Sequence, residues 1–234
     1  MRFTKLNDDS SWLWEINGIK ILVDPWFTPS QVDFFPWFSE QFHVSPQPTV
    51  SEIPKPDYLF ISHPFTDHCN KETLLNFPKE IPVIGNDTVL NKIRKWHHFE
   101  QLIHLSEAPL TMSEFKPKSK LDLVHSAFHI ASTEGSILYA PHGSVVKDLP
   151  KAKVLLTTVS EYRLPFWLGG TVNLGFEKAL TTFNNCGAEF LLCTHDEQKL
   201  GKGLVARLAR KNYTMSIENP AIKILKAGEA FEVN

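Results

Sequence analysis

The chain has 234 residues, of which 42% are hydrophobic and 21% are charged, a composition typical of a soluble globular protein with a sizeable core. The formal net charge of −2 provides no basic field, which argues against a nucleic-acid partner. Three cysteines without regular spacing argue against a disulfide framework. Because no apolar run has the length of a signal-peptide core or of a membrane span, we expect a cytoplasmic protein with no membrane partner.

The first 23 residues are predicted to form an antiparallel β-meander. Residues 12–16 alternate between apolar and polar side chains, and residues 19–23 form a second apolar run that ends at Asp24-Pro25. Asn17-Gly18 separates the two runs, and this dipeptide favours the type I′ turn of a hairpin. Residues 1–6 are expected to add a third strand.

The segment 25–56 differs from its surroundings because it contains seven prolines and seven aromatic side chains. We interpret it as an irregular insertion within a single domain that spans residues 1–234. A segment this long and this aromatic is unlike an ordinary solvated loop. It is either an irregular cap over the core or a lid that faces a substrate.

The rest of the chain alternates between short apolar strands and helices, which predicts an α/β fold. Asn86 is expected to cap the second helix, and residues 160–175 are expected to be irregular. The predicted helices are 71–77, 86–96, 174–183 and 202–211. The predicted strands are 57–61, 81–84, 101–105, 112–116, 121–125, 128–131, 136–139, 153–158, 189–193, 215–217, 222–225 and 230–233.

Histidines follow three of these strands directly. His63, Asp67 and His68 lie in one turn after residues 57–61, His142 follows residues 136–139, and His195 follows residues 189–193. Loops at strand ends are where an α/β scaffold presents metal ligands. One such histidine is more often structural, but three at strand ends together indicate a metal site.

These motifs resemble those of the metallo-β-lactamase superfamily, in the branch of ascorbate-phosphate-lactonase-like hydrolases. Val23-Asp24-Pro25-Trp26 is similar to that branch's strand-Asp-Pro-Trp signature. Residues 61–68 match the family's His-x-His-x-Asp-His loop at three of its four positions, with Phe65 in place of the second histidine. The resemblance covers about residues 3–233 and implies a four-layer αββα sandwich.

The resemblance also implies which residues hold metal. Asp67 and His68 belong to the second metal site of the family, and His195 matches its last histidine. His142 occupies the place of the aspartate that bridges two metals. In the first metal site, Phe65 stands in place of one histidine ligand, so His63 is left as an outer or alternative ligand. The third histidine of that first site would be His125 or His129.

These assignments predict one divalent transition metal, held by Asp67, His68, His142 and His195. Three nitrogens and one oxygen suit zinc or iron better than calcium or magnesium, and we favour zinc over iron or manganese. Four direct ligands would close a tetrahedral zinc, so either His142 orients water or substrate or the metal has more ligands. Asp24 is either a partner that orients a ligating histidine or a turn residue before proline.

We expect a metal-dependent hydrolase that cleaves a small ester, lactone or phosphodiester, with Asp67 and His142 in catalytic roles. Two alternatives remain from other classes. One is a metal-binding or inactive member of the family whose aromatic segment is an interaction surface, and the other is a redox protein with one iron. Three cations follow His195, and we interpret them as a solvated helix face or else as contacts for an anionic substrate. They are Lys199, Lys202 and Arg207.

Overall fold

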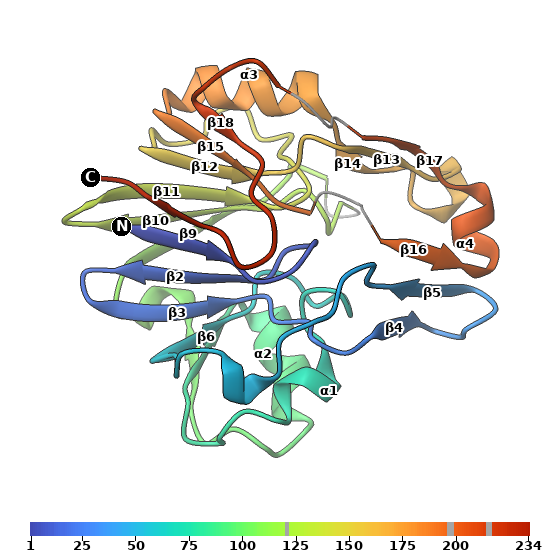
Figure 1. The fold of residues 1–234 in the computed structure, drawn as a ribbon, viewed down its shortest axis with the longest axis horizontal. Coiled ribbons are helices and arrows are strands. Elements are labelled where there is room, and N and C mark those ends of the chain that lie inside the picture. The colour runs from blue at the N-terminus through green and yellow to red at the C-terminus, as the bar shows by residue number, and fades with distance from the viewer. Residues whose placement is uncertain (120–121, 196–198, 214–216) are drawn as a thin grey trace.

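Two β-sheets face each other at the centre of the molecule, and helices cover their outer faces (Figure 1). The computed structural model describes residues 1–119, 122–195, 199–213 and 217–234. Helices α1 (Lys71–Leu74) and α2 (Asp87–Arg94) lie outside one sheet, and α3 (Phe176–Cys186) lies outside the other. This arrangement confirms the predicted αββα sandwich. No helix in the described part of the chain has the length and apolar character that a bilayer span requires.

The first sheet has the strand order β19-β1-β2-β3-β6-β7-β8. Its strands are β1 (Arg2–Lys5), β2 (Trp12–Ile16), β3 (Ile19–Val23), β6 (Tyr58–Phe60), β7 (Val83–Gly85), β8 (Leu102–His104) and β19 (Ala230–Glu232). The predicted hairpin is confirmed, because Asn17 and Gly18 have φ angles of 51° and 75° and connect β2 to β3. The Asn86 side chain accepts a hydrogen bond from the backbone N–H of Val89 and caps α2, as predicted.

The second sheet has the strand order β18-β15-β12-β11-β10-β9. Its strands are β9 (Thr111–Phe115), β10 (Ala127–Ser132), β11 (Gly135–Ala140), β12 (Val154–Thr157), β15 (Phe190–Cys193) and β18 (Ile222–Lys223). Strands β11, β12 and β15 are parallel, as are β3, β6 and β7 in the first sheet. Their carboxyl ends therefore supply loops to the same end of the sandwich.

Alternating side chains fill separate layers of the core. In β6, Phe60 joins the cluster between the two sheets, whereas Leu59 packs in the cluster beneath α1 and α2. In β11, Tyr139 points between the sheets and Leu138 packs in the cluster that includes α3 residues. Strands that are buried on both faces read as continuous apolar runs, which is why the sequence pattern located them.

Two small sheets replace segments that were predicted to be irregular. Within 25–56, β4 (Ser30–Asp33) and β5 (Ser39–Phe42) form a hairpin that pairs with β16 (Leu200–Lys202). Within 160–175, β13 (Glu161–Arg163) and β14 (Thr171–Leu174) form a second hairpin, which pairs with β17 (Arg210–Asn212). Both were missed because these strands are short and only half-buried, so they lack an apolar run.

Other boundaries also differ from the predictions. Residues 122–126 are not a strand, so the strand predicted over 121–125 is wrong in its described part. The next strand along the chain is β10. The helix predicted over 202–211 is the shorter α4 (Gly203–Leu208) followed by β17. The strand predicted over 215–217 lies largely outside the described residues.

Candidate metal centre

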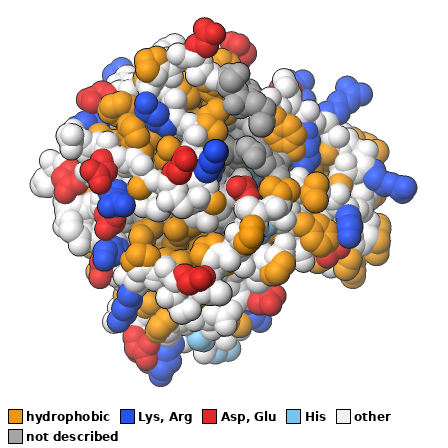
Figure 2. Space-filling model, in the orientation of Figure 1, with side chains coloured by type: hydrophobic (Ala, Val, Ile, Leu, Met, Phe, Trp, Pro, Cys, Tyr) orange, Lys and Arg blue, Asp and Glu red, His pale blue; other side chains and the backbone are white. Residues whose placement is uncertain are grey.

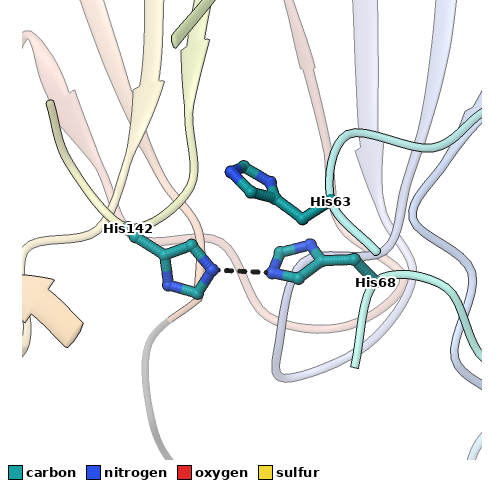
Figure 3. A group of neighbouring side chains, drawn as sticks. All are labelled: His63, His68 and His142. Atoms are coloured by element: carbon teal, nitrogen blue, oxygen red, sulfur yellow. Dashed lines mark hydrogen bonds between the residues drawn. The ribbon is translucent and has the colours of Figure 1, made fainter. Parts of the chain in front are cut away.

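Four histidines and one aspartate meet at the end of the sandwich where the parallel strands finish. His63, Asp67 and His68 come from the loop after β6, His142 follows β11, and His195 follows β15. The four histidines are at most 2% exposed, and Asp67 is 9% exposed. Figure 3 shows His63, His68 and His142 converging from the two sides of the site. The three histidine-bearing loops singled out in the sequence therefore lie together in the structure.

The atoms that could bind a metal lie within a few ångströms of one another. His68 Nε2 is 2.9 Å from His142 Nε2 (Figure 3). The same His68 nitrogen is 3.9 Å from Asp67 Oδ2. His195 Nε2 is 3.2 Å from the same Asp67 oxygen. Ligands bonded at about 2.0–2.2 Å to one ion lie roughly 2.8–3.6 Å apart. The separations of His68 from His142 and of His195 from Asp67 are those of neighbouring ligands on one ion, and the separation of His68 from Asp67 is slightly longer.

The second nitrogen of each of these rings has its own polar neighbour. His68 Nδ1 is 2.8 Å from Asp24 Oδ2, and His142 Nδ1 is 2.8 Å from Asn173 Oδ1. His195 Nδ1 lies 3.4 Å from Asp9 Oδ1, a buried oxygen with no hydrogen bond among the described residues. A ring that donates from Nδ1 presents its Nε2 lone pair to the site, which is the usual arrangement of metal-binding histidines.

The contact between His68 and His142 is a direct test of whether a cation fits. If both rings donate from Nδ1, two Nε2 lone pairs face each other across 2.9 Å in a buried site. Such a contact is repulsive unless a proton or a cation lies between the nitrogens. The donor set, three imidazole nitrogens and a carboxylate oxygen, suits a divalent transition metal. The residues present therefore fit the expected ion.

The candidate ligands form two overlapping groups. Two groups of residues have metal-binding atoms within 4.8 Å of one another, namely His63 with His68 and His142, and Asp67 with His68 and His195. His68 belongs to both groups, but its Nδ1 faces Asp24 and only Nε2 remains for a metal. An ion bound to His68 Nε2 can therefore occupy only one of the two groups at a time.

His63 lies closer to the cluster than the outer position that the family pattern suggested. Its ring centroid is 5.1 Å from that of His68 and 5.3 Å from that of His142. Its Nδ1 lies 2.8 Å from Ser62 Oγ, and its buried Nε2 makes no hydrogen bond to a described residue. Burial, followed by the neighbouring His68, lowers the pKa of His63 well below its usual range, so the ring is available as a neutral ligand.

The other two candidates for the first site lie outside the cluster. His125 Nδ1 is 2.9 Å from Asp122, and its Nε2 is 3.0 Å from the carbonyl oxygen of Val172, so both ring nitrogens are engaged. His129 lies within β10, with Nε2 3.2 Å from the carbonyl oxygen of Lys151. Neither is in a group of candidate ligands within the described residues. The expectation that either histidine completes a first site is therefore not met by this geometry.

Asp24 connects the clustered residues to the core. Its carboxylate accepts hydrogen bonds from the Ser62 backbone N–H at 2.7 Å and from the Tyr139 hydroxyl at 2.7 Å, while His68 Nδ1 lies 2.8 Å away. Asp24 also has a φ of 44°, and His195 one of 53°, a region that non-glycine residues rarely occupy. Both alternatives for Asp24 hold, since it precedes proline at a turn and contacts a histidine of the cluster.

The cluster is charged as well as buried. Burial, with His195 and His68 nearby, lowers the pKa of His142 well below its usual range. Burial alone would raise the pKa of the Asp67 carboxyl, but His68 and the hydrogen bond from His195 hold it well below its usual range. Asp67 is therefore an anion and His142 a neutral ring, the forms that bind a metal.

Sequence reasoning missed several residues around the cluster. Asn173 on β14 contacts both His142 and His195. Lys199 was interpreted as part of a solvated helix face, but its side chain is 2% exposed and its Nζ is 2.8 Å from Asp9 Oδ2 and 3.8 Å from Asp67 Oδ2. The only sequence signal for Asp9 was its place in a polar loop before β2.

A pocket of about 470 Å³ opens onto the cluster at Asp67 and His142. The β4–β5 hairpin supplies one wall, including Asp33, Phe34 and Phe38, so the aromatic segment faces the site. Burial and the negative charge of Asp67 raise the pKa of Asp33. A larger cavity of about 780 Å³ lies elsewhere and is lined by none of the clustered histidines.

The fold and the histidine cluster define a class of protein that the comparisons with known proteins identify. Residues 4–195 match the beta-lactamase superfamily domain, and the chain belongs to the metallo-β-lactamase superfamily. No curated protein matches the sequence.

Solved structures share the whole fold at low identity. An isothiocyanate hydrolase from Delia radicum gut bacteria is 16% identical with a TM-score of 0.73, and the alignment covers 99% of each chain. A metallo hydrolase from the hyperthermophilic archaeon Ignicoccus hospitalis is 17% identical with a TM-score of 0.64, over 100% of this chain and 99% of that one. A metallo-beta-lactamase fold protein from Bacillus subtilis is 15% identical with a TM-score of 0.61, over 99% of each chain.

Proposed function

We propose that the protein is a metal-dependent hydrolase with one divalent transition ion held by Asp67, His68, His142 and His195. Zinc is favoured over iron or manganese because the donor set is rich in imidazole and its four members suffice for the usual zinc coordination number. The substrate is a small ester, lactone or phosphodiester. The shared fold with an isothiocyanate hydrolase and a metallo hydrolase supports this class of reaction.

The observation that carries the proposal is that two of these four side chains, Asp67 and His142, line a pocket. Asp67 and His142 line the pocket of about 470 Å³ and also belong to the buried cluster, so a molecule in the pocket would contact the cluster directly. Pockets of this size hold small molecules. A purely structural metal has no need of such an opening.

The ion, when bound, acts as a Lewis acid and lowers the pKa of a coordinated water from about 15.7 toward ~7. The residues around it hold the ion and orient its ligands. Asp24 accepts from the Nδ1 side of His68 and fixes that ring. Asp33 lines the pocket, where its side chain can contact a bound molecule.

Activity measurements with one histidine variant and a matched control test the proposal. Wild-type protein is assayed on phenyl acetate, γ-butyrolactone and bis(4-nitrophenyl) phosphate before and after chelator treatment and reloading with zinc, iron(II) or manganese(II). We expect hydrolysis that is lost with chelator, restored by one metal and reduced at least about 100-fold by His195→Ala. His125→Ala removes another buried histidine, which lies outside the cluster, and should change kcat/KM less than about threefold. Hydrolysis that survives chelator treatment would refute the proposal.

The alternative of a metal-binding module without hydrolytic activity is favoured by Phe65 and His142, which replace a histidine and a carboxylate of the family pattern. Its signature is one bound metal with no turnover of any of the three substrates. The iron redox alternative predicts instead that iron is retained preferentially and that its oxidation state changes on reaction with O₂, which absorption spectroscopy detects.

A further inference from the structure

The pocket beside the cluster has an apolar wall drawn from several distant segments. Phe34 and Phe38 come from the β4–β5 hairpin, Phe65 from the β6 loop, and Leu164, Leu168 and Val205 from the region of β13 and α4. Phe34 is 84% exposed and has a φ of 65°, so a large apolar ring is held at the pocket in an uncommon backbone conformation. Figure 2 shows hydrophobic side chains on the right of the molecule, the side on which Figure 1 places β4, β5 and α4.

Phe65 affects both the metal ligands and the pocket wall, because it stands where the family pattern has a histidine. Its ring lies 6.2 Å from that of His63 with an interplanar angle of 17°, and it also lines the pocket. The substitution therefore removes a metal ligand and adds apolar surface at the place where a substrate would approach the cluster.

The charges that face the pocket are negative. Asp33 and Asp67 are the charged side chains of the described lining, which includes no lysine or arginine. Of the cations close in sequence to this wall, Arg163 pairs with Glu161, the Lys202 Nζ lies over the ring of Phe42, and Arg207 is exposed and outside the pocket lining. An anionic substrate would lose its water without gaining a cationic side chain from this lining.

A bound divalent ion does not make the net charge of the site positive. Asp9, Asp24 and Asp67 surround the cluster with three carboxylates, and Lys199 supplies one positive charge. Together with an ion of charge 2+, these groups leave the site neutral, and an ionised Asp33 makes it negative. Among the described residues there is thus no net positive charge that would attract a phosphate or a carboxylate.

We propose that the pocket selects an uncharged ester or lactone that carries an aromatic or aliphatic group, and that it rejects anionic substrates, phosphodiesters included. This inference rests on the proposed hydrolase function and narrows its substrate class. In the reaction, water adds to the acyl carbon, the bond from that carbon to the alkoxy oxygen breaks, and the alkoxy oxygen takes up a proton. The products are a carboxylic acid and an alcohol, with no change of oxidation state.

Two esters of the same shape provide the kinetic test. 4-Acetylphenyl acetate is neutral, and 4-acetoxybenzoate carries a carboxylate at the same ring position. With each rate divided by its rate with hydroxide, we expect kcat/KM to favour the neutral ester at least about 100-fold, since a buried polar or charged group without a partner is rejected strongly. Equal rates, or a preference for the anion or for bis(4-nitrophenyl) phosphate, would overturn the inference while leaving the hydrolase proposal intact.

A charge introduced into the wall should change this preference. Leu168→Lys places an ammonium group at the pocket, so the anionic ester should be cleaved at least about tenfold more efficiently relative to the neutral ester. Leu75→Lys is the matched control, because Leu75 is 38% exposed and outside the pocket lining, and it should leave the preference unchanged. An equal effect of both variants would show that the protein's overall charge, and not the pocket, sets the preference.

Binding of amide analogues separates the pocket from the chemistry. In calorimetry with wild-type protein, 4-acetamidoacetophenone should bind at least about tenfold more tightly than 4-acetamidobenzoate, and Phe38→Ala should weaken the neutral ligand. If the neutral amide binds in this way but no ester is cleaved, the hydrolase proposal fails and the pocket preference stands. If neither amide binds and no ester is cleaved, both are overturned.

Discussion

Asp24 is the residue through which the core positions the cluster. Its carboxylate contacts His68, Ser62 and Tyr139, which come from the two central sheets or the loops that follow them. Partners of this kind orient a metal-binding ring and raise its basicity. We therefore assign to Asp24 a share of the metal affinity although it is not itself one of the proposed ligands.

Asp24→Asn should lower the affinity for zinc about 10–100-fold, as is usual when the partner of a metal-binding histidine is changed. Asp122→Asn is the matched control. It alters an equivalent contact, 2.9 Å from Asp122 to His125 Nδ1, that lies outside the cluster. Competition with a fluorescent zinc chelator gives both affinities. Equal losses in the two variants would mean that Asp24 acts only through general stability.

Restoring the family residue at position 65 should not restore a second metal. Phe65→His would place an imidazole beside His63, but His125 remains engaged with Asp122 and the carbonyl of Val172. We expect the metal content of Phe65→His to stay at about one equivalent by plasma mass spectrometry. A content near two would show that the first site needs only this one residue.

The sequence located much of the cluster, because Asp67, His68, His142 and His195 each follow an apolar strand and parallel strands end at one edge. It did not place Lys199 or Asn173 beside the cluster. Lys199 lies in a polar segment that resembles a solvated surface, and its burial depends on Asp9, which is 190 residues away in the chain. Contacts across such separations have no local pattern.

At the scale of elements, the β4–β5 hairpin is held over the pocket by α4. The backbone N–H groups of Leu204 and Val205 donate to the carbonyl oxygens of Trp37 and Phe38. Gly203 makes this approach close, because its φ is 88° and a Cβ there would lie 2.8 Å from both carbonyl oxygens. The hairpin's position thus depends on a glycine in another segment.

Gly203→Ala should displace the hairpin and weaken binding of 4-acetamidoacetophenone at least about tenfold, because a Cβ at this φ is strained and meets backbone atoms. Gly228→Ala also changes a glycine with a φ of 88°, has open space around its Cβ and lies outside the pocket lining, so it serves as the control. Calorimetry measures the binding, and circular dichroism checks that both variants fold. Unchanged binding in Gly203→Ala would show that α4 does not position the wall.

The prediction of elements succeeded for the central sheets and failed for the walls of the pocket. Strands such as β12 and β15 are buried runs, and the hairpin of β2 and β3 has a diagnostic turn. The β4–β5 hairpin has a loop-like amino-acid sequence. It pairs with β16, which comes from near the other end of the chain. Its pairing is set by tertiary contacts that override local propensity.

At the scale of the whole molecule, all three cysteines are buried and none forms a disulfide in the structure. Burial raises the pKa of Cys69 to about 12, above the value of about 8.5 for an exposed thiol. The native state therefore binds this proton more tightly than the unfolded state does. The stability that results is fully present below pH ~8.5 and is lost as the pH rises toward 12.

Between pH 9.5 and 10.5, wild-type protein should lose about 1.4 kcal/mol more unfolding free energy than Cys69→Ala does. Urea unfolding at each pH measures this difference, and the comparison of slopes removes the constant cost of the substitution itself. Parallel slopes for the two proteins would contradict the raised pKa.

The central claim, one transition metal at the meeting point of two sheets, is tested most directly by the metal content of the purified protein. Wild type purified without chelator should contain about one equivalent of a divalent transition metal, and the double variant Asp67→Ala His68→Ala should lose it. Plasma mass spectrometry gives both values. Less than about a tenth of an equivalent of any transition metal in wild type, or about two equivalents, would contradict the account.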